Sequence, residues 1–234
     1  MAVTRGRKGI EIKQASASEV FKLKDVCPSR ALIVSGEDKS IDEILSEVGK
    51  DLLFYNSSDG GVTLSGGEPL SQGPELEELL EGLVRMNVDI AIETSLHVSW
   101  ENIERCIRFT GTFLADLKHT DSSKFKEFTG GDSNLVMQNL VKLSECHENV
   151  IIRVPVIPGF NHTFSEIKDI TDFAVSLRTI REIHFLPYHN LGSGKYRMLG
   201  IKSDFDNIKN VDYEEVAGYV RYAQKKGLIA KTGG

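Results

Sequence analysis

The chain has 234 residues, of which 40% are hydrophobic and 26% charged, and its formal net charge at pH 7 is -6. This composition indicates an ordinary globular protein with one substantial core, and no apolar run approaches the roughly 20 residues that span a bilayer. The scattered lysines and arginines exclude a basic nucleic-acid surface, so small molecules or another protein are the expected partners, with no nucleic acid and no membrane. Because no signal-peptide pattern follows the basic N-terminus, we expect a cytoplasmic protein.

From about Ser40 onward, amphipathic helical patterns alternate with short apolar segments. Ser40 and Asp42 open a predicted helix whose apolar residues recur at helical spacing. Further helices are predicted over residues 76–84, 103–109, 135–143, 167–177 and 213–226. Five apolar segments between the helices are predicted as strands: Val62–Leu64, Val88–Ile92, Phe113–Leu117, Val150–Val156 and Ile183–Leu186.

Apolar strands separated by helices are typical of a parallel sheet with helical crossovers. We therefore predict an α/β fold, with a curved, barrel-like sheet that does not close. Residues 1–30 show little periodicity, and only residues 31–34 look like a strand, so we divide the chain into an irregular N-terminal segment (1–39) and the barrel (40–234). Ligand-binding groups are expected at the C-terminal ends of the strands.

The first polar motif, Ser65-Gly66-Gly67-Glu68-Pro69, follows the first predicted strand. Its two glycines let the backbone approach a ligand, and Glu68 adds a carboxylate that can bind an ammonium group. The alternative is a plain strand-to-helix turn, in which Pro69 and Pro74 begin helices. The motif alone leaves both interpretations open.

Two more motifs follow the next two strands. Glu93-Thr94-Ser95 offers a carboxylate and two hydroxyls to a ribose or a cation, unless Thr94 or Ser95 caps the following helix. In Asp116-Leu117-Lys118, strand alternation places Asp116 and Lys118 on one face. That pair either holds a zwitterion or a carboxylate, or forms a structural ion pair.

The last two strands each contribute a polar residue. Arg153 lies in the apolar strand Val150–Val156 and requires an anionic partner, which is a ligand carboxylate, Glu93 or Asp116. His189, preceded by Tyr188, can contact a purine and its ribose, or can be a structural histidine.

Together these motifs outline one pocket for a molecule with an amino-acid end, a ribose and an aromatic base, and S-adenosylmethionine fits that description. Two alternatives remain. A barrel enzyme acting on a phosphorylated small molecule would use a glycine-rich turn near the last strands, for which Leu191-Gly192-Ser193-Gly194-Lys195 is a candidate. A non-catalytic interaction subunit would bind a partner protein and no small molecule.

The motifs also resemble those of a known family, the glycyl-radical-enzyme activating enzymes of the pyruvate formate-lyase activase group in the radical S-adenosylmethionine superfamily. The resemblance covers residues 27 to 200. Its specificity comes from the order and spacing of several segments: KDLLFYNSSDGGVTLSGGEPLSQ, AIETS, LADLK, FTGG, VIIRVPVIPGFN and FLPYHNLGSGKY. It implies a partial (β/α) barrel of mostly parallel strands with outer helices.

The resemblance implies an oxidoreductase that reductively cleaves S-adenosylmethionine at a 4Fe-4S cluster and takes a hydrogen atom from a glycine of a partner enzyme. A flavodoxin or ferredoxin would supply electrons under anaerobic conditions. By resemblance, Ser65, Gly66, Gly67 and Glu68 hold the methionine amino group, Lys118 and Arg153 its carboxylate end, and His189 the adenosine. Glu93, Thr94 and Asp116 match positions that also frame a monovalent cation, although the family often has aspartate where Glu93 stands.

The sequence departs from the family at its front, where relatives carry a first strand and a C-x-x-x-C-x-x-C cluster loop. Its three cysteines, Cys27, Cys106 and Cys146, are isolated from one another and form no such triplet, so we interpret them as reduced thiols. Residues 26–32 resemble the end of the ferredoxin-like insert of many relatives, which makes Cys27 an orphan cluster ligand and residues 1–39 a remnant of that insert. We therefore expect a truncated activase that is inactive alone; the alternatives are a degenerate S-adenosylmethionine-binding module and a cluster loop supplied in trans.

Overall fold

The computed structural model describes residues 3–6, 9–12, 37–177, 179–192, 194, 196 and 208–233. The chain divides into two units, residues 1–40 with 190–207 and residues 41–189 with 208–234. The first unit contains an antiparallel hairpin of β1 (Val3–Gly6) and β2 (Gly9–Ile12), which the sequence did not predict, and the 3-10 turn η2 (Asn190–Gly192). The predicted strand at residues 31–34 lies outside the described residues.

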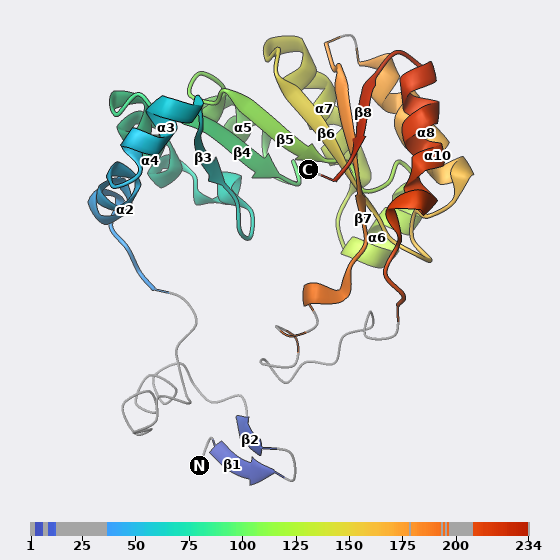
Figure 1. The fold of residues 1–234 in the computed structure, drawn as a ribbon, viewed down its shortest axis with the longest axis horizontal. Helices are drawn as coiled ribbons and strands as arrows, with labels where there is room; N and C mark the ends of the chain where they lie inside the picture. The colour runs from blue at the N-terminus through green and yellow to red at the C-terminus, as the bar shows by residue number, and fades with distance from the viewer. Residues whose placement is uncertain are drawn as a thin grey trace. The chain divides into compact units, whose positions relative to one another are not determined.

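The second unit is built on one six-stranded sheet in which every strand pairs in parallel with the next along the chain (Figure 1). Its strands are β3 (Gly61–Leu64), β4 (Asp89–Thr94), β5 (Thr112–Asp116), β6 (Val150–Val156), β7 (Glu182–Pro187) and β8 (Ile229–Thr232). Among the described residues β3 and β8 each pair with one neighbour only, so the sheet is open. The five predicted strands are confirmed. β8 was missed because only two of its four residues are apolar.

Eight α-helices of the described chain and one short 3-10 helix connect the strands. They are α2 (Ile41–Gly49), α3 (Leu52–Ser58), η1 (Pro69–Gln72), α4 (Pro74–Arg85), α5 (Trp100–Ile107), α6 (Ser122–Thr129), α7 (Ser133–Cys146), α8 (Phe164–Ser176) and α10 (Tyr213–Lys225). The sequence did not predict α3 and α6. The apolar residues of α3 are consecutive (Leu52, Leu53, Phe54), and α6 has only Phe125 and Phe128, so neither carries the repeated apolar stripe that marks a helix in a sequence.

The two faces of the sheet differ in chemistry. One face carries Ile92, Phe113, Ile152 and Ile183, which are fully buried in a single core with apolar residues of the helices. Successive strand residues point to opposite faces, so Glu93, Leu114 and Arg153 lie on the other, inner face. The outer face thus packs against the helices to form the core, whereas the inner face carries the charged residues Glu93 and Arg153.

Local signals explain where the helices begin. Pro69 and Pro74 stand at the first positions of η1 and α4, as the alternative of a strand-to-helix turn expected. Asp121, Asp132 and Thr163 cap α6, α7 and α8 by accepting backbone N–H bonds with their side chains. No helix in the part of the chain that the structure describes is long and apolar enough to cross a membrane.

Candidate functional site

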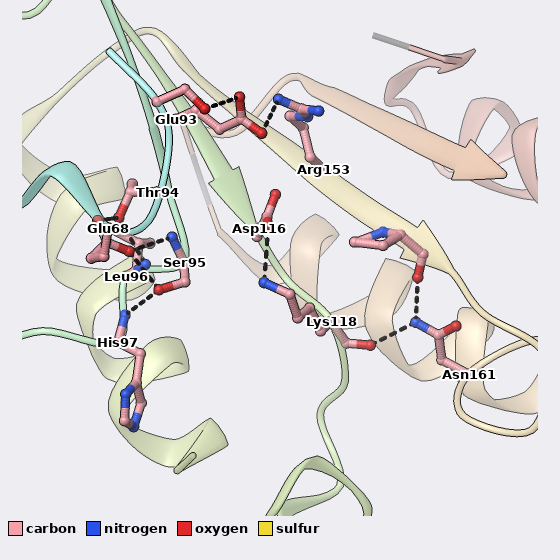
Figure 2. A network of polar contacts seen from close by, with 12 residues as sticks. Glu68, Glu93, Thr94, Ser95, Leu96, His97, Asp116, Lys118, Arg153 and Asn161 are labelled. Atoms are coloured by element: carbon pink, nitrogen blue, oxygen red, sulfur yellow. Dashed lines mark hydrogen bonds and ion pairs between the residues drawn. The ribbon is translucent and has the colours of Figure 1, made fainter. Parts of the chain in front are cut away.

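The polar motifs of four successive strands meet at one edge of the sheet, because β3 to β6 are parallel and end on the same side. Figure 2 shows how their side chains lie: Glu68, Thr94 and Ser95 form one group, and Glu93, Arg153, Asp116 and Lys118 form two charged pairs. Three carboxylates and two cationic groups are therefore gathered at this edge. The predicted convergence of these residues is what parallel strands require.

Glu68 links the end of β3 to the end of β4. Its carboxylate accepts hydrogen bonds from Thr94 Oγ1 at 2.8 Å, from the Ser95 backbone N–H at 2.9 Å and from Ser95 Oγ at 2.5 Å. It also accepts a bond from Leu70 N at 3.3 Å, which makes it the N-cap of η1. The alternative that Thr94 or Ser95 caps the next helix is wrong, since Ser99 is the N-cap residue of α5.

The glycine turn before Glu68 is open. Gly66 has a φ of 124°, a conformation that residues with a side chain rarely adopt. A Cβ atom added at Gly66 or at Gly67 would meet no atom within 4 Å. The turn therefore presents bare backbone to free space, as a turn that holds a ligand through its peptide groups must do.

Arg153 on β6 pairs with Glu93 on β4, across the intervening strand β5. Arg153 Nη1 lies 2.9 Å from Glu93 Oε1, and Ser65 Oγ donates to Glu93 Oε2 at 2.9 Å. Of the three partners considered for Arg153, Glu93 is the one that the structure shows. The Arg153 side chain is 18% exposed, and its Nε atom is buried without a hydrogen-bond partner. The guanidinium thus keeps a donor that Glu93 does not use.

Asp116 and Lys118 form the second pair, with Lys118 Nζ donating to Asp116 Oδ2 at 2.9 Å. The prediction that both side chains share a face is confirmed. In the sheet register, Asp116 is the direct neighbour of Arg153. The two ion pairs are therefore adjacent on the inner face, and both are less than one third exposed.

The loop after β4 is held in an unusual conformation. Leu96 is fully buried and has a φ of 55°, in the left-handed region that a residue with a large side chain rarely adopts. The Asn139 amide on α7 donates to Leu96 O at 2.9 Å and to Val98 O at 2.8 Å. Asn139 therefore fixes the loop that presents Ser95 to Glu68. The sequence analysis missed it, because nothing in the local pattern of α7 points to this loop.

No profile of a known protein family matches the chain. Individual relatives do: the chain is 34% identical to the pyruvate formate-lyase 2-activating enzyme of Escherichia coli over 224 residues, which are 96% of this chain and 76% of the relative. The chain belongs to the glycyl-radical-enzyme activating enzymes. This activase family also includes the (2S)-3-sulfopropanediol dehydratase activating enzyme of Klebsiella oxytoca, 32% identical over 88% of this chain and 65% of the relative.

Solved structures agree with the activase fold. The crystal structure of a domain of pyruvate-formate lyase-activating enzyme from Bacteroides vulgatus matches with a TM-score of 0.62 at 28% identity, over 75% of this chain and 99% of that domain. Streptococcus suis SuiB bound to S-adenosylmethionine matches with a TM-score of 0.62 at 16% identity, over 86% of this chain and 45% of SuiB, which supports the radical S-adenosylmethionine fold alone. The chain spans 65%, 64% and 57% of the length of three curated activase relatives.

The described residues do not provide the ligands of the family's 4Fe-4S cluster. Cys106 is buried in α5, where burial raises the pKa of its thiol to about 11 and so opposes the thiolate that iron binds. Cys146 stands alone on α7, and burial raises the pKa of its thiol as well. No group of three or more candidate ligands occurs among the described residues, and Cys27 lies outside them.

The remaining predictions are less constrained by the geometry. His189 follows β7 by two residues and is exposed. Glu93, Thr94 and Asp116 each bond a different partner, Arg153, Glu68 and Lys118 respectively, so the monovalent cation site stays a prediction. Of the alternative phosphate turn, Ser193 and Lys195 lie outside the described residues.

A cavity of about 450 Å³ lies next to the β4 loop and is lined by other residues, among them His97, Ser122, Lys126 and Gly131. His97 connects it to the site, because its backbone N–H donates to Ser95 Oγ at 3.3 Å. None of the predicted site residues lines this cavity.

Proposed function

We propose that this chain binds S-adenosylmethionine at the C-terminal edge of β3 to β7 and serves as the cofactor-binding part of a glycyl-radical-enzyme activase. The observation that carries the proposal is the open turn at Gly66 and Gly67 beside two adjacent, half-buried ion pairs. A partner glycyl-radical enzyme would be the protein substrate, and a flavodoxin or ferredoxin the reductant, as the family implies.

The chemistry of the ligand matches the chemistry of this edge. S-adenosylmethionine carries an ammonium group, a carboxylate and a sulfonium centre, so its binding site needs groups of both charges. We assign the carboxylate to Lys118 and to the guanidinium of Arg153, whose Nε has no hydrogen-bond partner. We assign the ammonium group to the peptide carbonyls of the turn at residues 65–67, because the Glu68 carboxylate already accepts four hydrogen bonds.

The assignment gives Glu68 the role of a positioning residue. Its bonds to Thr94 and Ser95 fix the direction in which the glycine turn leaves β3. The exposed imidazole of His189 is assigned to the adenosine, on the resemblance alone. In this proposal the described residues bind the cofactor and do not supply the electron that reductive cleavage requires, which in the family comes through the 4Fe-4S cluster.

Isothermal titration calorimetry tests the binding proposal directly. We expect the wild-type chain to bind S-adenosylmethionine and not glucose 6-phosphate, and we expect Lys118→Met to weaken S-adenosylmethionine binding by about tenfold or more, which corresponds to about 1.4 kcal/mol. Lys142→Met on α7, a lysine over the Trp100 ring, is the matched control and should leave the affinity unchanged. Binding of the sugar phosphate alone would instead support the phosphate alternative.

Anaerobic iron-sulfur reconstitution tests whether the isolated chain can hold the 4Fe-4S cluster of the family. We expect the isolated chain to hold no stable cluster, because its described thiols are buried or solitary. A stable cluster with one iron open to S-adenosylmethionine, seen by electron paramagnetic resonance, would overturn this expectation.

A further inference from the structure

A buried asparagine joins the loops that follow β5 and β6. Asn161 is fully buried, and its Nδ2 donates to Lys118 O and to Pro155 O, both at 2.7 Å. Its Oδ1 accepts the backbone N–H of Ile157, also at 2.7 Å. The side chain therefore uses both donors, whose bonds Figure 2 shows, and its acceptor at once, which only a primary amide can do in this space.

The bond to Lys118 O lies just beyond the end of the β5–β6 ladder. The paired residues end with Asp116 opposite Arg153, and Leu117 N then donates to Arg153 O at 2.9 Å. The carbonyl of the following residue, Lys118, then accepts from Asn161 Nδ2. Asn161 thus extends the hydrogen bonding between β5 and β6 to Lys118, whose ammonium group lies in the candidate site.

We propose that Asn161 is a positioning residue that holds the Lys118 backbone in place, so that Lys118 Nζ meets both Asp116 and the carboxylate of the ligand. This inference rests on the proposed function as far as the ligand is concerned. The positioning itself rests on the three hydrogen bonds of Asn161 and on its complete burial. An aspartate in its place would set a carboxylate against two carbonyl oxygens, and an alanine would leave those carbonyls unsatisfied.

Asn149 offers a matched control, because it lies at the opposite end of the same two strands. Asn149 Nδ2 donates to Gly111 O at 3.1 Å and to Thr112 Oγ1 at 2.6 Å, which ties the start of β6 to the start of β5. Asn149 is exposed and is remote in the register from Lys118. Asn161→Ala and Asn149→Ala therefore remove similar bonds between the same strands, at the two opposite ends.

Amide hydrogen exchange of the ligand-free protein tests the positioning without any cofactor. We expect Asn161→Ala to accelerate exchange in residues 117–121 by about threefold or more, and Asn149→Ala to leave that segment unchanged. If Asn161→Ala does not fold, Asn161→Ser is the second variant, since its hydroxyl can keep one of the two donated bonds. Unchanged exchange in residues 117–121 of a folded variant would overturn the proposal.

Ligand binding then tests whether positioning acts through Lys118. We expect Asn161→Ala to weaken S-adenosylmethionine binding by about tenfold but 5'-methylthioadenosine, which lacks the amino-acid end, by less than about twofold. In combination with Lys118→Met, Asn161→Ala should add no further loss, because the two residues form one unit. Equal weakening of both ligands, or additive effects, would show a general structural role. If the wild-type chain binds neither ligand, the proposed function fails, and the exchange result alone decides on Asn161.

Discussion

Strand β6 belongs to two different environments. Its residues Val150, Ile152, Val154 and Val156 are buried in the core, whereas Arg153 on the other face is paired with Glu93 and partly exposed. On the core face, any residue of suitable volume and polarity contributes to stability. On the inner face, the effect of a residue depends on one named partner. The comparison separates positions that maintain the fold from positions that build the site.

The largest effect is expected on the core face. Phe113→Ala removes a fully buried ring from β5 and should lower the free energy of unfolding by about 3–5 kcal/mol, measured by urea denaturation. Phe164→Ala, at a ring that is 54% exposed, is the control and should cost less than half as much. Similar losses for the two variants would contradict the assignment of the core to the outer face.

A smaller effect is expected when one partner of an inner-face pair is lost. Arg153→Met leaves Glu93 half-buried without its cation and should cost about 1–2 kcal/mol of stability. Adding Glu93→Gln should recover part of that loss, because the uncompensated carboxylate is then gone. Strictly additive losses in this double-mutant cycle would mean that the pair does not interact.

Glu68→Gln tests the link between the glycine turn and β4. The amide retains the shape of the carboxylate but places an NH2 group against donors, so we expect a loss of about 1 kcal/mol and faster amide exchange at Ser95. The control is Glu75→Gln in the first turn of α4, for which a change below about 0.5 kcal/mol is expected. Unchanged amide exchange at Ser95 would show that Glu68 does not hold the loop after β4 in place.

The smallest effect is expected at Asp172, a partly exposed residue of α8. Hydrogen bonds from Lys168, Lys226 and Tyr222 lower the pKa of the Asp172 carboxyl well below its usual range. Because the pKa is lowered in the folded state, this contribution is present above the ordinary aspartate pKa of about 4 and is lost as the pH falls below it. Asp172→Asn should cost less than about 1 kcal/mol at pH 7 and less still at pH 3, in urea titrations at both pH values.

Much of this arrangement is predictable from the sequence, because apolar periodicity marks the strands and polar residues mark their ends. The parallel order of the sheet then brings Glu68, Glu93, Asp116 and Arg153 to one edge. The pairing within that edge is not predictable, since Arg153 had three possible partners and it pairs with Glu93 on β4 although its direct neighbour in the register is Asp116. Asn139 and Asn161 were missed for a related reason: their bonds reach residues 41 to 43 positions away in the sequence.

The open sheet has a consequence for handling the protein. Within the described residues β3 pairs only with β4, so the other side of its four residues carries main-chain N–H and C=O groups that a strand from a second molecule can join. We therefore expect self-association through β3 to grow with protein concentration, and we expect Thr63→Lys, at an exposed residue of β3, to suppress it.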